Sequence, residues 1–272
     1  MNFSRTTLIA LRLILGICSL GLFAECSRQA PPGGPPHGPL SPLNYTMHLS
    51  SQRDGDCGPE GSGCVRVTVR YPEFSPLTGL RTPDSLNEAI KSYILRSAEE
   101  KGPAPDSISA LSEQFINAYR DRQRVFPGRW FWTLDRSVSV ARDSAGIVTL
   151  EMREYVFSGG AHPSESLVFA NFDKRTGMRL HLSDVIFPDR TADLTTAAEA
   201  AFRKVRNLEP GSSFLSHGFT FNDNVFRLND DFFPSGDTLI VHFNTYEVAP
   251  YAMGPTTLRI SLREFGGIVP RE

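Results

Sequence analysis

Apolar and polar residues alternate along several segments of the chain, with the period of two that is typical of half-buried β-strands. The clearest case is 64–71 (CVRVTVRY), in which three valines share one face. Two longer alternating runs, at about 130–140 and 148–156, are joined by Asp-Ser-Ala-Gly and predict a β-hairpin. Further strands are expected at 167–172 and 178–182, as a second hairpin, and at about 225–229, 238–246 and 256–262.

Three other segments carry apolar residues at helical spacing. The first begins at Thr82-Pro83 and extends to Lys101, the second runs from Asp106 to about Val125, and the third covers about 194–205, with Val205 on its inner side. Strands and helices do not alternate in the βαβ rhythm. We therefore predict an α+β fold, a mainly antiparallel sheet packed with about three helices, whose final strands close the sheet and whose two halves form one compact domain.

Residues 1–25 are typical of an export signal. Two arginines precede an apolar run of 12 residues, Leu13 to Ala24, which is too short to span a bilayer because a spanning helix needs about 20. The run ends at Cys26, in a lipobox-like sequence that has Glu25 where a small residue is usual. We expect a lipid anchor at Cys26, and cleavage after Ala24 is the alternative, which would give a secreted protein.

Proline and glycine dominate the segment that follows. Between Gln29 and Asn44 they fill nine of sixteen positions, so residues 26–44 are expected to form an extended tether. An inert linker is the alternative. The folded part is then 45–272, in two halves, 45–160 and 161–272. The expected location is exported and membrane-anchored, on the periplasmic or cell-surface side.

Cys57 and Cys64 are the only cysteine pair in the predicted folded part. They lie in CGPEGSGC, whose glycines and proline allow a tight loop, and an exported protein would oxidise them to a disulfide. Two thiolates without a nearby histidine do not complete a zinc site. The spacing also differs from the C-x-x-C of redox proteins.

Composition and charge exclude some classes of protein. The 272 residues are 40% hydrophobic, which suits a soluble globular fold. Lys plus Arg number 28 against 30 for Asp plus Glu, without a long basic block, so we expect no nucleic-acid partner.

Catalytic motifs are sparse. The six histidines include no H-E-x-x-H or H-x-x-x-H, and neither a G-x-S-x-G elbow nor a phosphate-binding glycine loop occurs. Asp230-Asp231 precedes Pro234-Ser235-Gly236, so we interpret it as a solvated turn rather than an acid/base pair. No catalytic residue, metal or cofactor is predicted.

Two loops carry the candidate ligand-binding residues. In one, Gly159 and Gly160 allow positive φ, and Pro163 favours an extended His162. In the other, which ends at Gly254, tyrosines on a rigid loop offer large contact area at low entropic cost. A structural hairpin connection and a plug for the sheet end are the alternatives. The candidate ligand-binding residues are His162, Pro163, Tyr246, Pro250 and Tyr251.

Three stretches also carry a family resemblance: GGAHP, then NFDKRTGMRLHLSDVIF, then HFNTYEVAPYAMGPTTLRISL. They resemble the RsiV-like domain family, which includes the ectodomain of a lysozyme-sensing anti-sigma factor and the non-catalytic domain of the peptidoglycan deacetylase PdaC. A weaker match (VRVTVRYPEF, SLNEAIKSYI) makes 45–160 PdaC-like and 161–272 RsiV-like. The resemblance implies an extracytoplasmic α+β domain with a binding surface on exposed loops.

The expected function is that of a non-enzymatic, surface-tethered binding domain of the cell envelope. Its ligand is expected to be a protein such as lysozyme or a peptidoglycan glycan. An envelope hydrolase associated with polysaccharide deacetylation, or a structural envelope protein without a ligand, are the alternatives. The Asp-Asp-Gly and paired-His motifs of the deacetylase domain do not occur in this sequence.

Overall fold

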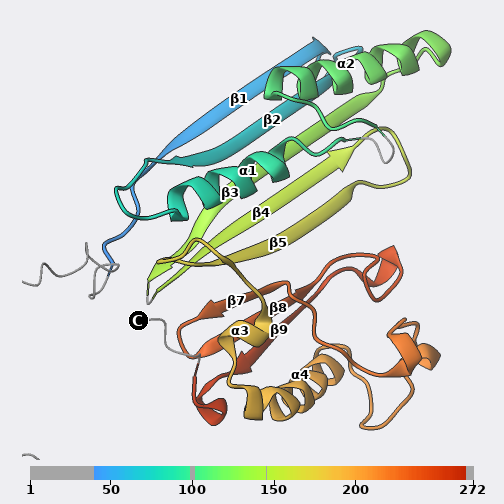
Figure 1. Ribbon diagram of the computed structural model, residues 1–272. Coiled ribbons are helices and arrows are strands. Elements are labelled where there is room, and N and C mark those ends of the chain that lie inside the picture. The colour runs from blue at the N-terminus through green and yellow to red at the C-terminus, as the bar shows by residue number, and fades with distance from the viewer. Residues whose placement is uncertain (1–39, 99–101, 145, 268–272) are drawn as a thin grey trace, which may run out of the picture. The chain divides into compact units, whose positions relative to one another are not determined.

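A computed structural model describes residues 40–98, 102–144 and 146–267 (Figure 1). The predicted signal, Cys26 and most of the tether lie outside these residues. The described part is an α+β structure with two β-sheets, one of six strands and one of three. None of the helices in the described ranges is long and apolar enough to cross a membrane.

The first sheet takes its strands in chain order, β1 to β6. Neighbouring strands are antiparallel except β2 and β3, which are parallel and are connected through two helices, as a parallel pair requires. The strands are β1 (Tyr45–Asp56), β2 (Gly63–Phe74), β3 (Phe131–Ser144), β4 (Ile147–Phe157), β5 (Ser164–Asp173) and β6 (Arg179–Leu180).

Two helices, α1 (Thr82–Ile94) and α2 (Ile108–Val125), lie over one face of this sheet (Figure 1). Pro83 occupies the first turn of α1, and the Ser107 hydroxyl caps α2 by accepting a hydrogen bond from the Ala110 N–H at 3.1 Å. The opposite face of β2, β3 and β4 carries exposed polar residues such as Asp135 and Arg153. This open face is therefore available for a site.

A buried arginine interrupts the apolar face of β3. The Arg136 side chain is 1% exposed and pairs with Glu154 on β4 at 2.5 Å. It also donates hydrogen bonds to the carbonyl oxygens of Ile94 at 2.8 Å and Arg96 at 2.5 Å. These carbonyls lie at the end of α1, where a helix leaves acceptors without partners. The predicted extension of this helix to Lys101 is wrong, because the chain leaves α1 where Arg136 binds it.

The second sheet is antiparallel, with the strands in the order β7 (Phe232–Ser235), β8 (Thr238–Phe243) and β9 (Thr256–Ser261). Helix α4 (Thr191–Val205) packs against β9. Phe202 of α4 is fully buried. Its ring centroid lies 5.0 to 5.8 Å from those of Phe214, Phe219, Phe221, Phe226 and Phe243. The C-terminal half therefore has a phenylalanine core of its own.

The elements of this half are α3 (Leu182–Val185), α4 (Thr191–Val205), β7 (Phe232–Ser235), β8 (Thr238–Phe243) and β9 (Thr256–Ser261). Short 3₁₀ turns cover Pro188–Arg190, Leu215–His217, Asn222–Asn224, Tyr251–Met253 and Arg263–Phe265.

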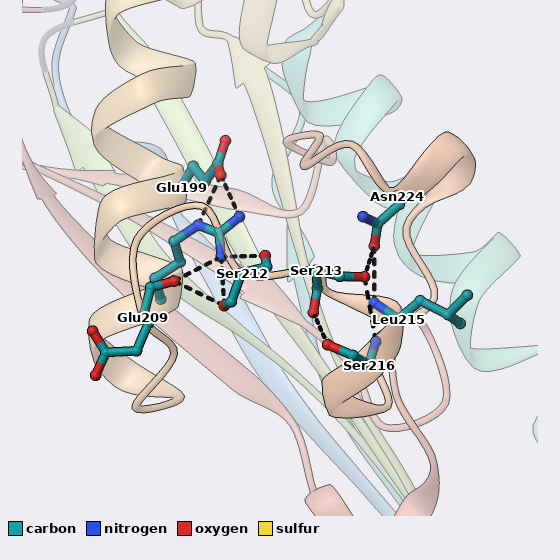
Figure 2. A network of polar contacts seen from close by, with 8 residues as sticks. Glu199, Glu209, Ser212, Ser213, Leu215, Ser216 and Asn224 are labelled. Carbon is teal, nitrogen blue, oxygen red and sulfur yellow. Dashed lines mark hydrogen bonds and ion pairs between the residues drawn. The ribbon is translucent and has the colours of Figure 1, made fainter.

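Polar side chains fix the loop that follows α4 (Figure 2). Arg203 pairs with Glu199 at 2.7 Å and donates a hydrogen bond to the carbonyl oxygen of Ser212 at 2.9 Å. Further along, the Asn224 side chain accepts a hydrogen bond from the Leu215 N–H at 2.8 Å. The loop between α4 and β7 is thereby held so that its phenylalanines reach the core around Phe202.

The predicted fold class is confirmed: the structure is α+β and mainly antiparallel. The two predicted hairpins correspond to β3–β4 and β5–β6, and α2 and α4 lie where the helical periodicity places them. Cys57 and Cys64 form the predicted disulfide, which closes the loop between β1 and β2.

Three predictions for the C-terminal half are wrong. Residues 225–229 form no strand: Phe226 is buried while Val225 and Arg227 are exposed, so the alternation arises from one side chain that enters the core. The last strands build a separate sheet instead of closing the first. Val205, expected on the inner side of its helix, is 51% exposed. Strands β1 and β7 were not predicted from the sequence. β1 is an edge strand in which no side chain is fully buried, so it has no apolar face to produce an alternating pattern.

Candidate functional site

Three aromatic side chains from two distant loops lie together. His162 belongs to the β4–β5 connection, and Tyr246 and Tyr251 belong to the β8–β9 connection. The rings of His162 and Tyr251 are stacked, with centroids 3.6 Å apart and planes at 11°. The Tyr246 hydroxyl lies 3.3 Å from Nε2 of His162. The structure thus brings together residues that the sequence analysis selected in two separate loops, and we call these three residues the aromatic site.

Tyr246 is an exposed member of the aromatic site, and its backbone is strained. It is 63% exposed and has φ of +69°, which is uncommon for a bulky side chain and costs about 1 to 3 kcal/mol. A tight turn imposes this conformation, since the Glu247 N–H donates to the Asn244 carbonyl at 3.1 Å and the Asn244 N–H donates to Oε2 of Glu247 at 2.8 Å. Backbone strain of this kind clusters at binding and active sites, which makes Tyr246 a candidate contact residue.

Side chains of the C-terminal half bind the free edge of β5, which β6 covers over only two residues. The Asn244 amide accepts from the Leu167 N–H at 2.8 Å and donates to the Leu167 carbonyl at 2.9 Å. The Asp231 carboxyl accepts from the Phe169 N–H at 2.7 Å and from Nδ2 of Asn244 at 3.1 Å. These bonds hold the turn that carries Tyr246 against the strand that follows the β4–β5 connection.

Arg206, the C-cap residue of α4, fixes the other part of the β8–β9 connection. Its guanidinium donates hydrogen bonds to the carbonyl oxygens of 253–255 at 2.8 to 2.9 Å and to the Thr256 hydroxyl at 2.8 Å. Burial lowers the pKa of Arg206. Arg206 therefore fixes the backbone of 253–255, between Tyr251 and the start of β9.

The two candidate prolines flank the aromatic site and add no ring contact of their own. Pro163 is half-buried and directly precedes β5, and its carbonyl oxygen lies 3.3 Å from Nδ1 of His162. Pro250 is exposed, and its carbonyl accepts a hydrogen bond from the Met253 N–H at 3.0 Å. Both prolines shape loops that present the aromatic rings.

Two of the three loop glycines use the positive φ that only glycine adopts without strain. Gly159 has φ of +82° and Gly254 has φ of +64°, whereas Gly160 lies outside the positive region. A Cβ at Gly159 would lie 3.0 Å from Nε1 of Trp132. Of the adjacent pair, only Gly159 therefore requires glycine for backbone conformation.

A polar cleft of about 370 Å³ adjoins the aromatic site. Its lining includes Asp135, Tyr155 and Glu165 from the open face of the first sheet. The C-terminal half contributes His242, Asn244 and Thr245, the last of which precedes Tyr246 in the chain. Carboxylates, an amide, hydroxyls and aromatic rings therefore face one open space, which suits a polar ligand with flat apolar surfaces.

Two titratable groups lie at this cleft: the buried His242, which lines it, and the half-buried Asp231, which accepts a hydrogen bond from Asn244 of the lining. Burial and, to a smaller extent, the nearby Glu247 carboxylate raise the pKa of Asp231 to about 7, against the hydrogen bonds from Phe169 and Asn244. Burial lowers the pKa of His242, whose Nδ1 lies 2.9 Å from the Thr257 hydroxyl. The prediction of a solvated turn is wrong for Asp231, because its carboxyl binds the edge of β5.

Asp231 makes the stability of the fold depend on pH. Its pKa is 3.8 in an unfolded chain and about 7 in the folded one, so folding takes up a proton between these values. The free energy of unfolding should therefore fall by about 2 kcal/mol as the pH rises from about 4 to 7, with partial exposure taken into account. We expect Asp231→Asn to remove this dependence in urea titrations. Asp189→Asn, at an exposed carboxyl, should retain it, and an unchanged slope in Asp231→Asn would contradict the assignment.

The residues that assemble the site could not be predicted from the sequence. Asn244, Asp231 and Arg206 act through hydrogen bonds to backbone groups of other elements, which leave no periodic signal. Within the described ranges, no three His, Cys, Asp or Glu side chains are grouped closely enough to hold a metal ion. The arrangement can hold a ligand by ring stacking and hydrogen bonds.

Comparison with known proteins gives two family matches. Residues 60–165 match the model described as "Deacetylase PdaC", and residues 183–263 match the model described as "Protein of unknown function (DUF3298)". No curated protein matches the chain.

Two solved structures share the fold. A DUF3298 family protein from Pseudomonas aeruginosa PAO1 is 22% identical, with a TM-score of 0.61 over 84% of this chain and 95% of that one. A DUF3298 member from Bacteroides fragilis is 17% identical, with a TM-score of 0.65 over 84% and 94%. These matches confirm the resemblance predicted from the sequence: the chain combines a PdaC-like segment with a DUF3298-like segment, in the fold of the solved DUF3298 proteins.

Proposed function

We propose that this chain is a non-enzymatic binding domain, tethered on the outer side of a membrane, that binds a glycan of the cell wall such as peptidoglycan. The observation that carries the proposal is the exposed Tyr246 ring, held at positive φ beside the stacked rings of His162 and Tyr251. The PdaC-like match supports an extracytoplasmic location. Lipidation of Cys26 would supply the tether.

Sugar rings combine apolar faces with hydroxyl groups at their edges. An aromatic side chain offers a flat apolar surface at low entropic cost, and neighbouring polar groups bind the hydroxyls. Tyr246 provides such a surface, and the cleft beside it provides Asn244, Thr245 and Ser137. The cleft is open, as a polymer that passes through it would require.

A basic protein such as lysozyme is the second candidate ligand. It is favoured by Asp135 and Glu165, two exposed carboxylates in the cleft that have no ion pair among the described residues. Exposed tyrosines also serve as protein contacts. A glycan probe and lysozyme can be titrated against the same purified chain, so one set of binding measurements separates the two candidate ligands.

Tyr246→Ala should weaken binding of chitin hexasaccharide and of soluble peptidoglycan fragments about tenfold, since it removes one stacking surface of about 1 to 1.5 kcal/mol. Calorimetric titration of the purified chain measures this, with lysozyme as a parallel ligand. Phe126→Ala is the matched control, because this ring is 52% exposed but lies at the end of α2. Binding that Tyr246→Ala leaves unchanged would refute the site, and binding of lysozyme alone would favour the second candidate.

A further inference from the structure

We infer that the cleft selects glycans whose sugars carry free amino groups over glycans whose amines are acetylated. This inference rests on the proposed glycan binding at the same site and names its ligand class. The observation behind it is a row of three side chains, Asp135, Tyr155 and Glu165, on the open face of the first sheet.

The strand register places these residues side by side. Asp135 of β3 is directly opposite Tyr155 of β4, and Tyr155 is directly opposite Glu165 of β5. Directly opposite residues of an antiparallel pair point to the same face of a sheet, with Cα atoms about 4.5 to 5.5 Å apart. The tyrosine therefore stands between two carboxylates whose Cα atoms are roughly 10 Å apart, two strand spacings. All three side chains line the cleft.

The two carboxylates of the row are free to receive a cation. Neither Asp135 nor Glu165 has a hydrogen-bond or ion-pair partner in the described part of the chain. Other carboxylates of β4 are already paired, Glu154 with Arg136 at 2.5 Å and Glu151 with Arg153 at 2.6 Å. Among the described residues, Arg153 is the only arginine that lines the cleft, and it is engaged by Glu151. Two negative charges remain on the wall of the cleft, one on each side of an exposed ring.

A primary ammonium group matches this row. It pairs with a carboxylate, and the face of a tyrosine ring attracts it further. An acetylated amine carries no charge, so it forms neither the ion pair nor the cation–π contact. A polymer of amino sugars presents its amines at regular intervals, so each carboxylate can receive one. Each exposed pair contributes little, and the combined preference should be about tenfold and sensitive to salt.

The test compares two chemically matched probes, the glucosamine hexamer and the N-acetylglucosamine hexamer, at about pH 6, where an amine of this type is protonated. We expect the purified chain to bind the free-amine hexamer about tenfold more tightly, and this ratio should shrink at high salt. The double variant Asp135→Asn/Glu165→Gln should bind both hexamers equally and should keep its affinity for the acetylated one, which also shows that the site remains folded.

A charge-matched control completes the design. Asp189→Asn/Glu209→Gln makes the same change of net charge at exposed positions outside the cleft, and it should retain the preference. Equal binding of both hexamers by the unmodified chain, or a preference that survives Asp135→Asn/Glu165→Gln, would overturn this inference while leaving glycan binding intact. Binding of neither hexamer would overturn the proposed function itself.

Discussion

Replacing Arg136 by methionine is expected to lower the free energy of unfolding by about 4 kcal/mol. The arginine is 1% exposed, and the variant would leave Glu154, a largely buried carboxylate, with only its longer ion pair to the half-exposed Arg96 at 3.6 Å. It would also remove the donors for the Ile94 and Arg96 carbonyls at the end of α1. Urea unfolding followed by circular dichroism measures the loss.

The double variant Arg136→Met/Glu154→Leu separates the causes. If the cost comes from the unpaired carboxylate, the double variant should recover most of the lost stability, because an apolar pair can replace a buried ion pair. A double variant as unstable as Arg136→Met alone would instead place the cost at the end of α1. Arg66→Met, at an exposed position on the neighbouring strand β2, should change stability by less than about 0.5 kcal/mol.

Asn244→Ala is expected to cost about 3 kcal/mol of stability and to weaken ligand binding at least tenfold. The substitution removes both hydrogen bonds to Leu167 and leaves the Asp231 carboxyl with one donor fewer, in a partly buried setting. It also detaches from β5 the turn that carries Tyr246, although the backbone hydrogen bonds within that turn remain. Calorimetric unfolding gives the first value, and hexamer titration at a temperature where the variant is folded gives the second.

Asn222→Ala is the matched control, since this exposed asparagine makes no side-chain hydrogen bond within the described ranges. It should change neither stability nor affinity measurably. If Asn244→Ala destabilises the chain but binds the glycan normally, the amide supports only the fold, and Tyr246 does not depend on it for its position.

The periodic parts of the fold could be predicted from sequence. The alternation in β3 and β4 and the helical spacing in α2 and α4 are repeated over ten or more residues, so single exceptions do not hide them. Elements without a buried face, such as β1, gave no such signal. Arg136 occupies an inward position of β3 among apolar residues, and its burial depends on the end of a helix some 40 residues earlier in the chain, which no local pattern reveals.

The site was predictable only in part. Glycine and proline content marked both loops, and tyrosine content marked the β8–β9 connection, but no pattern showed that His162 stacks on Tyr251. That contact depends on the packing of the C-terminal half against β5. Asn244 and Asp231, which create this packing, are ordinary turn residues in the sequence and gain their role only through the partners that the fold brings to them.

Strand β5 pairs with β4 in the first sheet and is also bound by Asn244 and Asp231 of the C-terminal half, so the chain cannot be divided cleanly at this strand. The PdaC-like match ends at residue 165, inside β5, and the DUF3298-like match begins at residue 183, after β6. A fragment cut between them would expose the backbone edge of β4 or the buried Ala170 and Phe172, and such edges invite pairing with other chains and aggregation. The two matched segments should therefore unfold in a single cooperative step.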